Sequence, residues 1–159
     1  MNPCPCGYLG HPKIACTDSP QQINQYRRKL SGPLLDRFDL HIEVAFQAGA
    51  VLLGKSVPAE SSEQVFKRVK SARSIQLKRQ SKLNSELTSI ELQQYCELSP
   101  KTQALLESAM DRLALSARGA HRVIKLAGTL ADLACSELIE SVHITEALAY
   151  RGLDRKSGV

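Results

Sequence analysis

The fold of this chain is decided by residues 116–134, which read SARGAHRVIKLAGTLADLA. Ser116 is a good N-cap, and the apolar residues after it recur at intervals of three and four, as along one face of a helix. Many residues of this face are small, which permits a neighbouring helix to approach closely. The face consists of Ala120, Val123, Ile124, Ala127, Leu130, Ala131 and Ala134. We therefore predict a packed helix here.

Helical patterns surround this run from residue 61 onward. Ser61 and Gln64 have the spacing of a capping box and predict a helix that ends near residue 80. A short helix is expected around 89–95, and Ser99-Pro100 is a strong start for another. Residues 142–151 predict a last short helix. The apolar face expected for the helix after Pro100 comprises Leu105, Leu106, Ala109, Met110 and Leu113.

The first third of the chain has a different pattern. It is rich in Pro, Gly and Cys, with one helix expected over 21–30. Residues 40–44 alternate between apolar and polar side chains, as in a half-buried strand. A lone strand is not stable, and we see no partner strands in the sequence. This third therefore resembles the edge of a larger α/β domain.

The predicted fold class is mainly α, a small helical bundle with an incomplete α/β edge at its N-terminus. We expect residues 1–47 to form that edge and residues 48–60 to form a linker. Residues 61–152 form the helical domain, and residues 153–159 a polar tail.

Composition excludes several classes of protein. A chain of 159 residues is too short for a multi-domain enzyme. Its composition, 43% hydrophobic and 23% charged, is typical of a folded domain and excludes disorder. Only 4% are aromatic and there is no Trp, which argues against a stacking platform for single-stranded bases. No apolar run is long enough to cross a bilayer, and Met1 does not open a leader sequence. We expect a cytoplasmic protein.

The positive charge is concentrated in one segment. Residues 62–82 hold seven basic side chains and one acidic side chain, a net charge of +6, whereas the whole chain carries +5. Either a solvated helix face or a surface for the phosphate backbone of DNA explains such a stripe. The candidates for DNA contact are Lys67, Lys70 and Arg73.

Cysteines cluster near the N-terminus. Cys4, Cys6 and Cys16 lie in a turn-rich loop, and Asp18 or His11 could supply a fourth ligand for zinc. The odd total of five cysteines and the lack of a secretion signal argue against a disulfide framework. A zinc site and a set of free thiols both remain open.

Two arginines stand at positions suited to phosphate chemistry. Arg37 lies between Asp36 and Asp39, where it forms either a structural ion pair or a guanidinium positioned to reach a phosphate. Arg118 lies in the first turn of the helix that Ser116 caps, where the helix dipole favours anions, and Arg122 follows one turn later. A solvated surface Arg is the alternative.

Four blocks of sequence together resemble a known family. They are NPCPCG at 2–7, SGPLLDRFDL at 31–40, SARGAHRVIKLAGTLADL at 116–133 and LAYRGLDR at 148–155. In this order they are similar to the carboxy-terminal part of the ComM/YifB proteins, a bacterial branch of the magnesium-chelatase-like AAA+ ATPases. The resemblance covers essentially the whole chain.

The resemblance implies roles for individual residues. Asn2 matches the sensor-1 residue that helps to place the attacking water, Arg37 the arginine finger offered to a neighbouring subunit, and Arg118 the sensor-2 arginine of the helical lid. The family also has two CxC pairs, of which Cys4 and Cys6 keep the first and Cys16 keeps half of the second. A zinc site then needs Asp18 or His11 as the substitute ligand.

The resemblance also implies a function. It leads us to expect part of a hexameric AAA+ motor that uses ATP and Mg²⁺ to remodel DNA by branch migration during natural transformation. We find neither a Walker A loop nor a Walker B acid, and so expect a piece of a longer protein that does not cleave ATP alone. The alternatives are a nucleotide-independent DNA-binding or adaptor module and a magnesium-chelatase-type subunit.

Overall fold

The computed structural model describes residues 1–44, 46 and 59–151 of the chain. These residues fall into two compact units. One comprises Met1–Arg37 and continues at Ile42, and the other comprises Phe38–His41 and continues at Ala59. The expected tail at 153–159 and most of the expected linker at 48–60 lie outside the described residues.

The first unit contains a cysteine-rich loop followed by two short helices. Helix α1 spans Pro20–Arg27, and a capping box between Ser19 and Gln22 fixes its start. It ends three residues before the expected end at residue 30. Helix α2 is a single turn, Gly32–Leu35, with Pro33 as its second residue.

The strand predicted over residues 40–44 is wrong. These residues have no regular structure, and the described residues contain no strand, only an isolated bridge between Leu98 and Ile139. Ile42 and Val44 are 68% and 86% exposed, so the alternating pattern does not face a core here. The physical reason is that the described part of the chain supplies no partner strand, without which a strand's backbone groups have no ladder to join.

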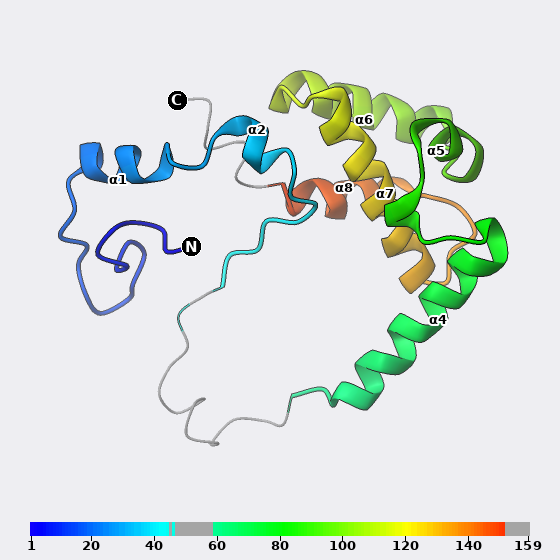
Figure 1. The fold of residues 1–159 in the computed structure, drawn as a ribbon, viewed down its shortest axis with the longest axis horizontal. Helices are drawn as coiled ribbons and strands as arrows, with labels where there is room; N and C mark the ends of the chain where they lie inside the picture. The colour runs from blue at the N-terminus through cyan, green and yellow to red at the C-terminus, as the bar shows by residue number, and fades with distance from the viewer. Residues whose placement is uncertain (45, 47–58, 152–159) are drawn as a thin grey trace. The chain divides into compact units, whose positions relative to one another are not determined.

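The second unit is helical, which confirms the mainly α fold class. Its elements in chain order are α4 (Ser62–Gln80), the 3₁₀ turn η1 (Asn84–Glu86), α5 (Ser89–Tyr95), α6 (Pro100–Leu113), α7 (Ala117–Leu133) and α8 (Ser141–Ala149). The capping box at Ser61 and Gln64 is present as predicted, and the Ser99 and Ser116 hydroxyls cap α6 and α7. Figure 1 shows these helices gathered around α7.

Helix α7 is central because its apolar face packs against most of the other elements, namely α4, η1, α5 and α8. Val123 and Ala127 of α7 and Ile144 and Ala147 of α8 are almost completely buried. Of the seven residues predicted for the α7 face, Ala134 is the exception, since it is exposed. It forms the C-cap, where the helix ends and its face no longer meets a neighbour.

A buried polar network joins α4 to α7. The Arg79 guanidinium donates to both carboxylate oxygens of Asp132, at 2.7 and 3.1 Å. The Asn84 side-chain amide donates to the same carboxylate at 2.8 Å and to the Thr129 hydroxyl at 3.1 Å. Its carbonyl oxygen accepts from Gln80 at 2.8 Å. Because Asp132 is only 1% exposed, these donors are what makes its burial tolerable.

Helix α4 is packed over its C-terminal half only. Residues 62–71, its N-terminal half, are all exposed, and Figure 1 shows this N-terminal half extending away from the other helices of its unit. Val65, Phe66 and Val69 lie on it, exposed by 39%, 62% and 44%. The helix is held by Ala72, Gln76 and Gln80, which are buried against the rest of the unit.

Candidate functional site

A basic cleft of about 380 Å³ lies beside the N-terminal half of α7. Four α7 side chains line it at successive turns: Arg118, His121, Arg122 and Lys125. Asp39 and residues of η1 and α5 complete the wall. The helix places these cations on one side because residues three and four apart share a face.

The cations of this cleft differ in how they are held. The Lys125 ammonium donates to the Ser85 carbonyl at 3.0 Å, and Arg122 forms an ion pair with Asp39. His121 Nδ1 lies 3.3 Å from the Ser89 hydroxyl oxygen. Arg118 is exposed, and within the described residues its side chain has no hydrogen bond or ion pair. Arg118 is therefore the cation available to an anion at the positive end of the α7 dipole.

Asn2 and Arg37 lie in the first unit, whereas Arg118 lies in the second. Arg37 is exposed in the turn after α2, where its backbone amide donates to the Leu34 carbonyl at 3.0 Å. Asn2 is exposed, and its side-chain nitrogen would lie 3.4 Å from a Cβ at Gly7. Gly7 has a φ of +81°, which a glycine adopts without strain in the tight turn after Cys4.

The cysteine loop brings four potential metal ligands together. The sulfur atoms of Cys4, Cys6 and Cys16 lie 3.4 to 3.6 Å apart, and an Asp18 oxygen lies 3.7 Å from the Cys16 sulfur. All four donor atoms lie within 4.8 Å of one another. Tetrahedral zinc with bonds of about 2.3 Å to sulfur separates its thiolates by about 3.8 Å, so the donor set fits zinc.

Local structure explains why Asp18 and not His11 joins the thiols. Asp18 directly precedes the N-cap Ser19 of α1, and its carboxylate accepts from the Cys6 amide at 2.8 Å. His11 Nδ1 instead accepts from the backbone amides of Lys13 and Ile14, at 3.1 and 3.0 Å. Of the two substitutes that the sequence left open, Asp18 is the one beside the thiols.

Hydrogen bonds and burial shift the pKa values of Cys6, Cys16 and Asp18 in different directions. For Cys6, the Asp18 carboxylate raises the pKa, but the Tyr8 and Thr17 amides outweigh it and leave the pKa at about 7. Burial raises the pKa of Cys16 to about 12, and the neighbouring thiols add to this. The Cys6 amide and thiol hold the pKa of Asp18 below its usual value. Asp18 therefore favours its anionic form, the form that ligates a metal.

The basic residues of segment 62–82 divide into those that bond a carboxylate and those that do not. Arg79 bonds Asp132, and Lys82 lies 2.6 Å from Glu91, which lowers the pKa of that carboxyl to about 2. On the exposed half, Lys67 pairs with Glu63 and Arg68 with Glu60, each at 2.7 Å. Three cations have no such bond within the described residues: Lys70, Arg73 and Lys78.

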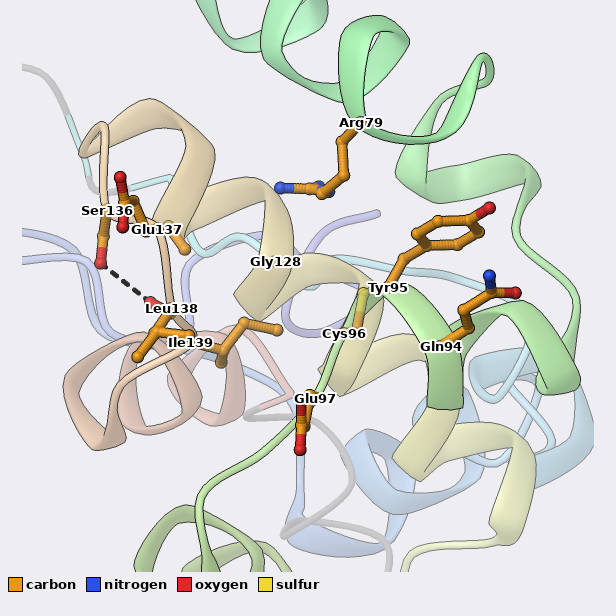
Figure 2. A pocket seen from close by; sticks show the side chains of 11 residues that line it. Arg79, Gln94, Tyr95, Cys96, Glu97, Gly128, Ser136, Glu137, Leu138 and Ile139 are labelled. Atoms are coloured by element: carbon orange, nitrogen blue, oxygen red, sulfur yellow. Dashed lines mark hydrogen bonds between the residues drawn. The ribbon is translucent and has the colours of Figure 1, made fainter.

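A second cleft, of about 340 Å³, lies between α5, α7 and the loop before α8. Figure 2 shows Arg79 and Tyr95 on one side of it and residues 136–139 on the other, where the Ser136 hydroxyl donates to the Leu138 carbonyl at 2.8 Å. The Arg79 guanidinium is committed to Asp132. The wall therefore offers no free cation to a phosphate, unlike the cleft at Arg118.

The expectation that no Walker A pattern is present is wrong at the level of sequence. Residues 49–56 read GAVLLGKS and satisfy G-x-x-x-x-G-K-S. They lie outside the described residues. In a P-loop the Lys and Ser open a helix, whereas here residues 59–61 are not helical and α4 begins only at Ser62, behind its own N-cap. The pattern thus lacks a helix that continues past residue 58.

Comparison with known proteins places the chain in a family. Residues 59–151, more than half of the chain, match the family described as magnesium chelatase, subunit ChlI C-terminal. The chain belongs to this magnesium chelatase family. Residues 1–52 match a second description, magnesium chelatase, subunit ChlI. The two matches leave residues 53–58 between them, and so the GAVLLGKS pattern crosses the end of the second.

Curated members of the family confirm the resemblance to ComM/YifB proteins. The chain is 43% identical over 155 residues to the uncharacterized protein YifB of Escherichia coli and 43% identical over 157 residues to the competence protein ComM of Haemophilus influenzae. Each match covers 98% of this chain. An uncharacterized protein of Mycobacterium tuberculosis is 34% identical over 94% of the chain. The chain spans about 30% of the length of these relatives.

One contact of the cleft was not predicted from the sequence. Asp39 was a candidate ion-pair partner of Arg37, but it pairs with Arg122. The two residues are 83 positions apart, and no local pattern links them. Only the fold brings the segment after Arg37 to the side of α7.

No described helix is both long enough and apolar enough to cross a membrane.

Proposed function

We propose that the chain supplies the nucleotide-sensing lid and the arginine finger of an ATP- and Mg²⁺-dependent motor that remodels DNA as a hexamer. In this proposal Arg118 contacts the phosphates of ATP bound in its own subunit, Asn2 helps to place the attacking water, and Arg37 reaches the nucleotide of the neighbour. Bound Mg²⁺ neutralises phosphate charge in such reactions. Membership of the magnesium chelatase family supports the proposal.

The proposal rests mainly on the exposed Arg118 side chain, which has no hydrogen bond or ion pair within the described residues. Its neighbours Arg122 and Lys125 are bonded to protein oxygens, whereas Arg118 is exposed at the first turn of α7. An arginine there combines bidentate donation with the positive end of a helix dipole. This is the chemistry that a terminal phosphate requires.

Replacing Arg118 with Ala tests this role. We would insert the chain into Haemophilus influenzae ComM in place of the segment that it matches, and measure ATP turnover and nucleotide affinity. The chimera is expected to hydrolyse ATP, and the variant to bind nucleotide about tenfold or more weakly, because a charged hydrogen bond to phosphate is lost.

The matched control is Arg112→Ala, since Arg112 is an exposed arginine on α6 away from the cleft. It should leave nucleotide affinity unchanged. A folded chimera without ATP turnover, or equal affinity in the Arg118 variant, would contradict the proposal.

We propose further that the cysteine loop binds zinc through Cys4, Cys6, Cys16 and Asp18. The loop offers three thiols and one carboxylate at tetrahedral spacing. Such a site stabilises the loop because metal binding and local folding are coupled. A structural role is expected, since all four positions would be filled by the protein.

Elemental analysis of the chain tests the zinc site. Protein made in medium with zinc is expected to contain about one equivalent of metal, and Cys4→Ser to contain far less, because three ligands hold zinc weakly. Cys135→Ser is the control, since this exposed thiol lies in the helical unit. If the parent chain contains no zinc under these conditions, the loop carries free thiols and the proposal fails.

A contact with DNA is the second function that the structure favours, and it would serve a nucleotide-independent module equally well. Helix α4 carries three exposed basic residues, Lys67, Lys70 and Arg73. Lys67 pairs with the exposed Glu63, and Lys70 and Arg73 have no such bond within the described residues. Lys70 and Arg73 are three positions apart and share a face. In this proposal they contact phosphates of the DNA backbone and read no bases.

Fluorescence anisotropy with random-sequence DNA at two salt concentrations tests this contact. The variant with Gln at Lys67, Lys70 and Arg73 is expected to bind more weakly and to lower the slope of log affinity against log salt by about 2 to 3, because each phosphate contact contributes about 0.9. The control removes the same charge at Lys13, Lys101 and Arg112. Equal affinities and slopes in parent and α4 variant would exclude α4 as the DNA surface.

A further inference from the structure

The four residues that follow Arg37 belong to the helical unit, although the residues on either side of them belong to the other. Three contacts hold this segment, Phe38–His41. Asp39 pairs with Arg122 of α7, the Phe38 carbonyl accepts from Arg151, and the His41 amide donates to the Tyr150 carbonyl. The segment is therefore fastened at both of its ends and at its middle.

Burial shows that one of these contacts is built into the core. Arg151 lies two residues after the end of α8 and is 1% exposed, and its guanidinium donates to the Phe38 carbonyl at 2.7 Å. A buried guanidinium is costly unless its donors are satisfied, so this position selects a backbone carbonyl beside it. The His41 amide lies 2.7 Å from the Tyr150 carbonyl oxygen, although neither residue is in a strand.

The second contact connects the segment to the basic cleft. Arg122 lies one turn after Arg118 on α7, and both line the cleft. Arg118 is available to a ligand, whereas Arg122 is held by the Asp39 carboxylate. Since the two arginines sit on one rigid helix, a displacement of α7 moves them together.

We propose that Arg122 and Arg151 are positioning residues that hold Phe38–His41 on the helical unit and thereby orient Arg37. This role rests on the proposed function of Arg37 as an arginine finger.

Amide hydrogen exchange of His41, followed by NMR in this chain, tests the anchor itself. In Arg122→Gln the His41 amide is expected to exchange about fivefold faster or more, because loss of a charge-assisted bond favours local opening of the segment. The amide of Ile144, in the core of α8, should keep its rate and so report that the unit remains folded. Lys125→Gln is the control on the same helix, since Lys125 bonds Ser85 and not the segment.

A charge exchange completes the test. The double variant Asp39→Lys with Arg122→Glu is expected to restore slow exchange at His41, which neither change does alone. An unchanged His41 rate in Arg122→Gln, with Ile144 also unchanged, would overturn the anchor. This result needs no nucleotide, so it is separate from any failure of the proposed ATPase role.

In the ComM chimera, the same Arg122→Gln change should lower kcat for ATP at least about fivefold and leave KM near its parent value. The reason is that a displaced finger weakens the transition state more than it weakens ground-state binding. A rise in KM with constant kcat would instead make Arg122 a direct phosphate ligand and would overturn the positioning role.

Discussion

Replacement of Arg37 with Ala is expected to lower ATP turnover by the ComM chimera about a thousandfold. An arginine finger stabilises charge on the transferring phosphoryl group, and its loss typically costs kcat by a factor on the order of 10³ to 10⁵. The exposure of Arg37 in the turn after α2 leaves its side chain accessible to a neighbouring subunit. KM for ATP should change little, because the finger acts mainly in the transition state.

Arg28→Ala is the matched control, since Arg28 is an exposed arginine at the C-cap of α1 in the same unit. It should retain parent turnover. A conservative Arg37→Lys change is expected to restore only a small part, because an ammonium cannot donate in the planar fork of a guanidinium. Near-parent kcat in Arg37→Ala would remove Arg37 from the catalytic machinery.

The largest effect on stability is expected from Asp132→Ala. This change leaves the Arg79 guanidinium and the Asn84 amide without the carboxylate that both of them bond. Breaking such a partly buried pair by removing one partner costs about 3 to 5 kcal/mol of unfolding free energy. Urea unfolding followed by circular dichroism at 222 nm measures it.

The control for this substitution is Asp111→Ala, because Asp111 is exposed on α6. It should change the unfolding free energy by less than about 0.5 kcal/mol. Replacing the pair by apolar residues, Arg79→Met with Asp132→Leu, should recover much of the loss, since no charge is then left unpaired. A loss below about 1 kcal/mol in Asp132→Ala would show that the network does not hold α4 to α7.

Local signals predicted the helical unit well. Ser61, Ser99 and Ser116 each begin a helix by capping its first amides, a feature that depends only on neighbouring residues. The apolar spacing of residues 120–131 also predicted correctly which side of α7 is buried. These features can be predicted from the sequence because a helix makes its backbone hydrogen bonds within one stretch of chain.

Features that depend on residues far apart in the chain were not predicted from the sequence. The alternation at residues 40–44 predicted a strand, but a strand needs partners that local sequence does not supply. The Arg79–Asp132 pair joins positions 53 apart, and the Arg122–Asp39 pair joins positions 83 apart. The cysteine cluster was predicted from the closeness of Cys4, Cys6 and Cys16 in the sequence, whereas the choice of Asp18 over His11 required the geometry of the loop.

Mixing two inactive variants of the chimera tests the central claim most directly. One subunit carries Arg37→Ala and the other Arg118→Ala, and each alone is expected to be nearly inactive. If Arg118 acts on the nucleotide of its own subunit and Arg37 on that of its neighbour, equal mixing creates intact sites at about a quarter of the subunit interfaces. The account predicts that ATP turnover reappears in the mixed hexamers. Turnover as low as that of each variant alone, in hexamers shown to contain both subunits, would contradict it.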